Sequence, residues 1–345
     1  MKRALLVGAG GWARSKWVNV LLPDFDDRVS VAGVVDIDAD ALRESGEALS
    51  VPPERRYTEM DRAFAEVEAD FCIISVPPAH HRRAAVLAAG NGMHIISEKP
   101  LADTHEDARA IHLAVTERTI KMVITQNYRF ETPILTLKDV LASGRLGRLN
   151  YVMARYAHDY REAGSWRVDH VYEREHPLLI EGGIHHLDML RNLTGSNCET
   201  IMGYGWNPGW SAFKSVSSCM LVMQMENGVK AVYEGNSLEA GRINPWFHEG
   251  YRVECEKGAA VLDSDQVVRV YQRDTQGNET VEEIPSINVN RAGHHVIMTD
   301  FLDWLDGGDP PETQLSDNAH SAAMLFAAIA AIEGGEVERV SAYLP

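Results

Sequence analysis

The sequence has few cysteines, and their spacing argues against a zinc cluster and against a disulfide-stapled scaffold. Four cysteines occur in 345 residues, and no two of them form a C-x-x-C motif. Zinc clusters and disulfide-stapled scaffolds both need clustered cysteines, so neither is indicated. We expect reduced thiols in a cytoplasmic protein, and no bound metal.

Positive charge and long apolar runs are also scarce. The chain has 33 Lys and Arg against 50 Asp and Glu, which gives a net charge of −17 at pH 7. Such a surface repels phosphate backbones, so no nucleic-acid partner is expected. The longest apolar run near the end of the chain, residues 322–332, is too short to span a bilayer. It predicts a buried helix rather than a membrane contact.

Short apolar runs alternate with helix-like segments in the first third of the chain. Strands are predicted at 4–7, 29–35, 71–76, 93–97 and 121–125, and helices at 12–22, 38–49, 58–67, 81–89 and 104–117. Continuous apolar strands separated by helices are typical of a parallel sheet covered on both faces. Residues 1–125 are therefore predicted to form a doubly wound α/β domain.

The pattern changes after residue 125 to longer segments in which apolar and polar residues alternate. Strands are predicted at 149–160, 217–226, 229–237, 251–256 and 267–273, and helices at 178–193, 295–305 and 316–333. Hairpin-like turns such as Glu226-Asn227-Gly228 indicate a largely antiparallel sheet. We expect residues 126–345 to form a second, α+β domain, with a cleft between it and the first.

A glycine-rich turn, Gly8-Ala9-Gly10-Gly11-Trp12-Ala13, directly follows the first predicted strand. In this G-x-G-x-x-A pattern Gly8 permits a tight turn, Gly10 lets the backbone approach a pyrophosphate, and Ala13 lets the helix pack closely on the strand. The N-terminus of that helix offers N–H groups and the positive end of its dipole to phosphates. The pattern predicts a dinucleotide-binding turn, with a plain βαβ turn as the alternative.

An acidic residue, Asp36, ends the second predicted strand. A carboxylate at this position accepts hydrogen bonds from the adenine ribose hydroxyls and repels a 2′-phosphate. Asp38 adds negative charge, and no Arg follows Asp36 immediately. NAD is therefore favoured over NADP.

The fifth predicted strand runs into Ser97-Glu98-Lys99-Pro100. Ligands gather at the carboxyl ends of strands in a doubly wound sheet, so Lys99 is expected where a nicotinamide would lie. Pro100 biases the backbone of Lys99 toward an extended conformation, which aims the side chain. An ordinary surface lysine is the alternative.

The segment 181–188 brings together two carboxylates and an imidazole. In a helix, Glu181, His185 and Asp188 would share one face. Two carboxylates raise the pKa of a neighbouring histidine, which suits proton transfer. Metal binding that also uses His176 and His186 is one alternative, and a capping or core role is another.

Together these features resemble the Gfo/Idh/MocA oxidoreductases, the family of glucose–fructose oxidoreductase and inositol dehydrogenase. The resemblance covers essentially the whole chain, and the matching segments are 8–13, Asp36, 77–80, 98–100, 127–130 and 181–188. It implies a Rossmann domain followed by an open, mostly antiparallel sheet that builds homodimers or homotetramers. It also implies NAD(P)-linked oxidation of a carbinol on a sugar or cyclitol, or the reverse reaction.

The resemblance assigns the chemistry to Lys99 and His185, with Glu181 orienting the histidine where many members have Asp. His185 would act as general base or acid, and Lys99 would stabilise the alkoxide-like oxygen. The implied cofactor contacts are Gly8, Gly10, Gly11, Trp12, Ala13, Asp36, Ser75, Pro77, His80, Glu98, Lys99, Asn127 and Arg167. The implied substrate contacts are Lys99, Arg129, Tyr160, Arg161, Trp166, His185 and Asp188.

The abundance of His, Arg and Tyr near residues 156–170 suggests a small polyhydroxylated substrate. Two other functions stay open. Glu181 in place of Asp keeps open an NAD-dependent glycosidase that acts by oxidation, elimination and re-reduction. A non-catalytic NAD-binding sensor is the second alternative, and the presence of both Lys99 and His185 argues against it.

Overall fold

The computed structural model describes residues 1–165, 169–241 and 243–345, and their contacts define two compact units. The first unit contains Met1–Gln126, His294–Ala322 and Pro345, and the second contains Asn127–Gly293 and Ala323–Leu344. Helix α8 (His294–Leu305) therefore belongs to the first unit, although it follows the second in sequence. The domain limit at residue 125 stays a prediction.

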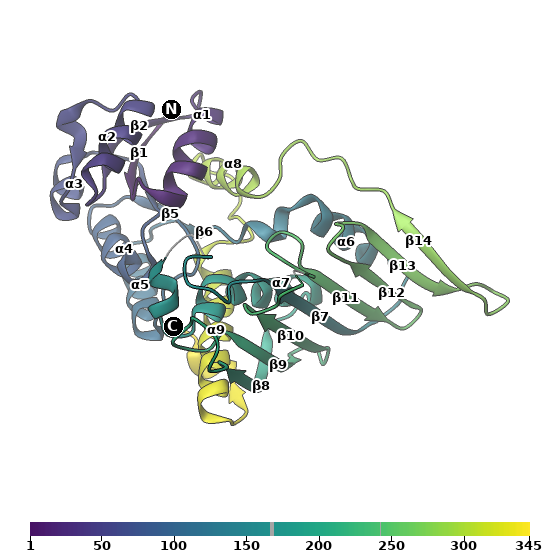
Figure 1. Cartoon of the computed structure of the whole chain (residues 1–345). Helices are drawn as coiled ribbons and strands as arrows, with labels where there is room; N and C mark the ends of the chain where they lie inside the picture. The colour runs from purple at the N-terminus through teal and green to yellow at the C-terminus, as the bar shows by residue number, and fades with distance from the viewer. Residues whose placement is uncertain (166–168, 242) are drawn as a thin grey trace. The chain divides into compact units, whose positions relative to one another are not determined.

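A six-stranded parallel sheet forms the centre of the first unit (Figure 1). Its order is β3 (Arg56–Tyr57), β2 (Val29–Val35), β1 (Lys2–Val7), β4 (Phe71–Ile74), β5 (His94–Ser97) and β6 (Met122–Ile124). The helices of this part of the chain are α1 (Leu22–Asp24), α2 (Ala39–Ala48), α3 (Met60–Glu66), α4 (His81–Gly90) and α5 (His105–Glu117). β4 is buried along its whole length, as expected for a strand covered on both faces. The predicted doubly wound sheet is confirmed.

The second unit contains a nine-stranded sheet in which only β7 and β10 pair in parallel among the described pairs. Its order is β14 (Glu279–Ile284), β13 (Val268–Arg273), β12 (Gly258–Leu262), β11 (Gly250–Cys255), β7 (Leu149–Ala157), β10 (Lys230–Asn236), β9 (Ser218–Met225), β8 (Cys198–Trp206) and β15 (Glu338–Arg339). Helices α6 (Thr132–Ala142) and α7 (Ile184–Thr194) pack against strands of this sheet. The predicted mostly antiparallel sheet is confirmed.

Three strands of five or more residues in this sheet were not predicted: β8, β12 and β14. Each lacks the alternation of apolar and polar residues on which such a prediction depends. β8 contains Gly203 and Gly205, β12 is built from small and aliphatic residues, and β14 is exposed along nearly its whole length. Edge strands such as β14 need no buried face, so their sequences carry little periodic signal.

Two predicted helices depart from α-helical geometry. The segment predicted at 12–22 is a π-helix, η1 (Ala13–Leu21). The helix predicted at 178–193 starts as a π-helix, η6 (Leu178–Gly183), and continues as α7 up to Thr194. Gly195 ends it with φ +60°, a left-handed conformation that glycine adopts without strain.

Helix α9 (Leu315–Gly334) is long and apolar enough to cross a bilayer by length and composition alone. In the structure, however, 67% of its most apolar window is buried, as in the core helix of a soluble protein. The buried helix predicted over 322–332 is thus confirmed.

Candidate functional site

The glycine turn after β1 is shaped by close packing on one side and open space on the other. Gly8 has φ +95°, and a Cβ at this residue would lie 2.3 Å from the Ser75 carbonyl oxygen. Gly11 has φ +44°, and nothing lies within 4 Å of the position its Cβ would take. No side chain caps the N-terminus of η1, which begins at Ala13. The turn therefore leaves room for a pyrophosphate at Gly11, the uncapped start of η1 leaves N–H donors, and the segment fits a dinucleotide.

Asp36, at the end of β2, holds the glycine turn directly. Its Oδ2 accepts hydrogen bonds from the N–H groups of Ala9 (2.6 Å) and Gly10 (3.2 Å). The hydroxyl of Ser45, on α2, donates to the Ala9 carbonyl at 2.7 Å. The carboxylate predicted to meet a ribose thus also fixes the backbone of the turn.

Glu98, at the end of β5, joins four segments of the first unit and precedes Lys99. Its Oε1 accepts from the indole N–H groups of Trp12 (2.9 Å) and Trp17 (2.8 Å), and its Oε2 from the Thr125 hydroxyl (2.8 Å). The Nε2 of His294, on α8, lies 3.7 Å from Oε1. The strand end that carries Lys99 is therefore tied to the helix after the glycine turn.

The pKa of Glu98 is lowered from 4.5 to about 2. Burial, the largest contribution, raises it, because water no longer stabilises the charged form. The neighbouring His294 and the donors Trp12 and Thr125 lower it by more in total. Glu98 is thus an ionised carboxylate held in a buried site.

Polar atoms without a hydrogen-bond partner among the described residues lie at two further strand ends of this sheet. Ser75, predicted as a cofactor contact, follows β4, and its Oγ has no such partner. Gln126 follows β6, is 1% exposed, and has no partner for either amide atom. Sequence reasoning missed Gln126, because a single glutamine after a strand carries no motif.

The loop after β4 contains the other predicted contacts of this unit, Pro77 and His80. Pro77 precedes the 3₁₀-helix η3 (Pro78–His80), and His80 is exposed. The next residue, His81, is buried, and its ring nitrogens lie 2.9 Å from the Pro100 oxygen and 3.0 Å from the Val76 oxygen. His81 therefore bridges the loops after β4 and β5, a role that the sequence did not indicate.

In the second unit, His185 lies in the first turn of α7 and stacks on Tyr128. The two ring centroids are 4.2 Å apart, and the planes differ by 12°. The Tyr128 hydroxyl donates to Glu249 at 2.9 Å. The neighbouring His186 is bonded to the Tyr233 hydroxyl at 2.9 Å and lies 3.5 Å from Glu249. His185 is thus held from one side by an anchored aromatic ring.

The two carboxylates expected beside His185 each form an ion pair. Glu181 pairs with Arg174, both largely buried. Asp188 receives two hydrogen bonds from Arg129, at 2.7 and 2.6 Å, and these two side chains are 1% and 5% exposed. A buried bidentate pair of this kind needs both partners, because either charge alone would be costly to bury. The assignment of Arg129 and Asp188 to the substrate stays a prediction.

The remaining predicted residues lie elsewhere in the second unit. Tyr160 belongs to a buried cluster with Val171 and Leu238, and its ring stacks on His158 at 4.1 Å. Arg161 pairs with Asp159 at 2.8 Å. The Asn127 amide donates to Glu131 at 3.0 Å. Trp166 and Arg167 lie outside the described residues.

The chain matches one family over both units. Residues 2–126 match the oxidoreductase family with an NAD-binding Rossmann fold, and residues 134–261 match the GFO/IDH/MocA C-terminal domain. An uncharacterized protein of Sinorhizobium fredii, y4oX, is 36% identical over 99% of this chain and 96% of its own length. A D-apiose dehydrogenase of Paraburkholderia graminis is 25% identical over 97% of this chain and 89% of its own length.

Solved structures show the same fold. An oxidoreductase from Agrobacterium radiobacter, in complex with NAD⁺, L-tartaric acid and magnesium, gives a TM-score of 0.86 at 21% identity over 99% of both chains. The WlbA dehydrogenase from Bordetella pertussis, in complex with NADH and UDP-GlcNAcA, gives a TM-score of 0.80 at 19% identity over 98% of both chains.

The burial of an ionised Glu98 predicts a specific dependence of stability on acid. Its folded pKa of about 2 is below its ordinary value of 4.5, so its stabilising effect is present above pH 4.5 and is lost as pH falls toward 2. Between pH 6 and pH 3, we expect the free energy of unfolding of the wild type to fall by about 2 kcal/mol more than that of Glu98→Gln. Urea denaturation followed by circular dichroism measures both.

Glu66→Gln is the matched control. Glu66 also has a lowered pKa, caused mainly by its hydrogen bond with Arg62, but it is on the surface. Solvent screening should make its effect on acid sensitivity small. Equal acid sensitivity of the wild type and Glu98→Gln would contradict the role assigned to Glu98.

Proposed function

The chain belongs to the Gfo/Idh/MocA family of NAD-binding oxidoreductases, and on that premise we propose that it transfers a hydride between NAD and a carbinol carbon of a sugar or cyclitol. The observation that supports this most directly is the hydrogen bond from Trp12 to Glu98. It links the turn that fits a dinucleotide to the strand end that carries Lys99. An alkoxide-forming reaction needs a cation near the bound cofactor, and in this proposal Lys99, the residue after Glu98, supplies it.

In this proposal two side chains share the acid–base work. The bound nicotinamide supplies the acceptor or donor of the hydride. Lys99 binds the substrate oxygen and stabilises the negative charge that develops there. His185 takes the hydroxyl proton, or returns it in the reducing direction. The stack on Tyr128 restricts the imidazole before substrate arrives, which reduces the entropy lost on reaction.

Replacing either acid–base residue tests this assignment. We expect Lys99→Ala and His185→Ala to lower kcat by about 10²–10⁴, the usual loss for an acid–base group. NADH formation with a panel of sugars and cyclitols measures turnover, and fluorescence titration measures NADH affinity, which should stay nearly unchanged. Lys257→Ala and His112→Ala are the matched controls. Near-wild-type turnover in both active-site variants would refute the mechanism, and product release from glycosides without net NADH would favour the glycosidase.

We propose NAD rather than NADP because of Asp36. Asp36→Asn should keep an acceptor for the Ala9 and Gly10 N–H groups while removing the charge that repels a 2′-phosphate. Asp36→Ala should lose both effects. We expect Asp36→Asn to improve the affinity for NADPH with little loss of affinity for NADH. Asp36→Ala should weaken NADH binding about tenfold, because charged hydrogen bonds are lost. Fluorescence titration with both cofactors measures this, and tighter binding of NADPH by the wild type would contradict it.

We also propose that a second copy of the chain covers one face of the nine-stranded sheet. Met202, Tyr204 and Trp206 on β8 are exposed, as are Met220 and Val222 on β9. Cross-strand pairing sets Met202 opposite Val222 and Tyr204 opposite Met220, so the side chains form one apolar patch. Contiguous exposed patches of this kind mark interaction surfaces.

Charge placed in this patch should prevent assembly. We expect light scattering after size-exclusion chromatography to give a dimer or tetramer for the wild type, and a smaller species for Met220→Glu/Val222→Glu, because burying two carboxylates is costly. Val281→Glu on β14, an exposed position outside the patch, is the control. A monomeric wild type at micromolar concentration would contradict the proposal.

A further inference from the structure

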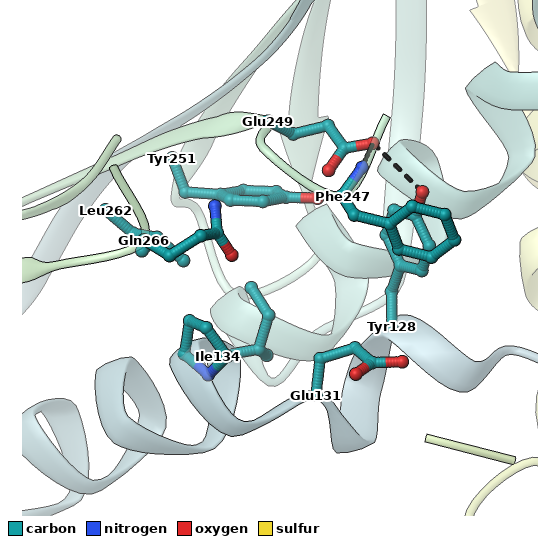
Figure 2. A pocket seen from close by; sticks show the side chains of 9 residues that line it. Tyr128, Glu131, Ile134, Phe247, Glu249, Tyr251, Leu262 and Gln266 are labelled. Atoms are coloured by element: carbon teal, nitrogen blue, oxygen red, sulfur yellow. Dashed lines mark hydrogen bonds between the residues drawn. The ribbon is translucent and has the colours of Figure 1, made fainter. Parts of the chain in front are cut away.

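A pocket of the second unit lies beside the ring on which His185 stacks. It holds about 400 Å³ of empty space, part of it open to solvent. Figure 2 shows Tyr128 and Glu131, from the segment that leads into α6, facing Tyr251 from β11 and Gln266 from the connection between β12 and β13. Tyr128 is both a wall of this pocket and the stacking partner of His185.

The inner end of the pocket presents polar atoms to an occupant. Glu249 is 4% exposed, and its bonds to the Tyr128 hydroxyl (2.9 Å) and the Phe247 N–H (3.2 Å) use the same oxygen, Oε1. Tyr251 is 2% exposed, and its hydroxyl has no hydrogen-bond partner among the described residues. Figure 2 shows this phenol directed toward Glu249. A buried hydroxyl without a partner is costly unless a ligand or water satisfies it.

The rim of the pocket contains two residues in the left-handed backbone region. Phe247 has φ +64° and Gln266 has φ +62°. For residues other than glycine this conformation is strained and persists where surrounding structure enforces it, often at binding sites. Glu249 accepts a hydrogen bond from the Phe247 N–H, and Phe247 is 52% exposed beside the pocket. The ring is thus presented to solvent rather than packed into the core.

The charge of the lining selects against one class of ligand. It includes two carboxylates, Glu131 and Glu249, and no Lys or Arg among the described residues that form it. Carboxylates accept hydrogen bonds from hydroxyl groups and repel carboxylates and phosphates. The exposed face of Phe247 offers an apolar surface to the C–H groups of a ring. This combination suits an uncharged ring that carries several hydroxyl groups.

We propose that this pocket binds the non-reacting part of the substrate, an uncharged hydroxyl-bearing ring, and rejects substrates that carry a carboxylate or phosphate there. Its link to catalysis rests on the proposed function, through Tyr128. An occupant would contact the face of the pocket formed by Tyr128, whose hydroxyl is anchored by Glu249 and whose ring supports His185. The pocket would then couple recognition of the remote ring to the position of the base.

Two glycosides that differ in one group test the selectivity. Methyl β-D-glucopyranoside and methyl β-D-glucuronopyranoside are added to the NADH-saturated protein, and saturation-transfer NMR titrations give their dissociation constants. We expect the neutral glycoside to bind at least about tenfold more tightly, because Glu249 and Glu131 repel the carboxylate of the glucuronide. Equal affinities, or no binding of the neutral glycoside, would overturn the proposal.

Variants at the rim locate the effect. Phe247→Ala should weaken binding of the neutral glycoside about tenfold by removing the stacking surface. Gln266→Lys should raise the affinity of the glucuronide about tenfold by placing a cation at the pocket. Tyr271→Ala, an exposed aromatic of β13 outside the pocket, should change neither value. If Phe247→Ala behaves like Tyr271→Ala, the pocket is not the binding site.

The binding and turnover measurements distinguish failure of the pocket proposal from failure of the proposed dehydrogenase reaction. Saturation transfer reports binding without turnover, whereas NADH formation reports the reaction. Selective binding without NADH formation from any sugar would support the pocket and count against the dehydrogenase reaction. Turnover with equal affinity for the two glycosides would support the dehydrogenase and overturn the pocket.

Discussion

The buried carboxylate of Glu98 ties separate segments of the first unit together. A charge in a site that is 7% exposed persists only if donors replace the lost water. Trp12 and Trp17, at the start of and within the helix after the glycine turn, and Thr125, after β6, supply these donors. The glycine turn, the end of β5 and the end of β6 are thereby held together, and Lys99 is carried by the segment they fix.

A buried carboxylate also organises the second unit, around His185. Glu249 is 4% exposed and takes the hydroxyl of Tyr128, whose ring supports His185. Asp188 and Arg129 form a buried pair within the same unit. In each unit, then, a buried carboxylate positions the neighbours of a residue proposed to take part in the reaction. A rigid scaffold of this kind reduces the reorganisation that a proton transfer requires.

Local sequence patterns predicted most of the sheet of the first unit. Five of its six strands follow from apolar runs between helical segments, and the two-residue β3 was too short to detect. The turn that begins at Gly8 could be predicted, because backbone conformation and close approach demand glycine there whatever the rest of the chain does. Asp36 was predicted at the end of the second strand as a ribose contact, and its two hydrogen bonds to the turn itself were not foreseen.

The sequence by itself determined the parallel sheet and the glycine-rich turn, because each depends on neighbours within a few positions. Only the tertiary structure decided what surrounds His185. Tyr128 and Glu249 are 121 residues apart in the chain, and their contact depends on how the segment before α6 packs against the residues before β11. The pairing of Asp188 with Arg129, 59 residues away, has the same origin. Helical periodicity can place side chains on one face, but the partners that this face meets are chosen by packing.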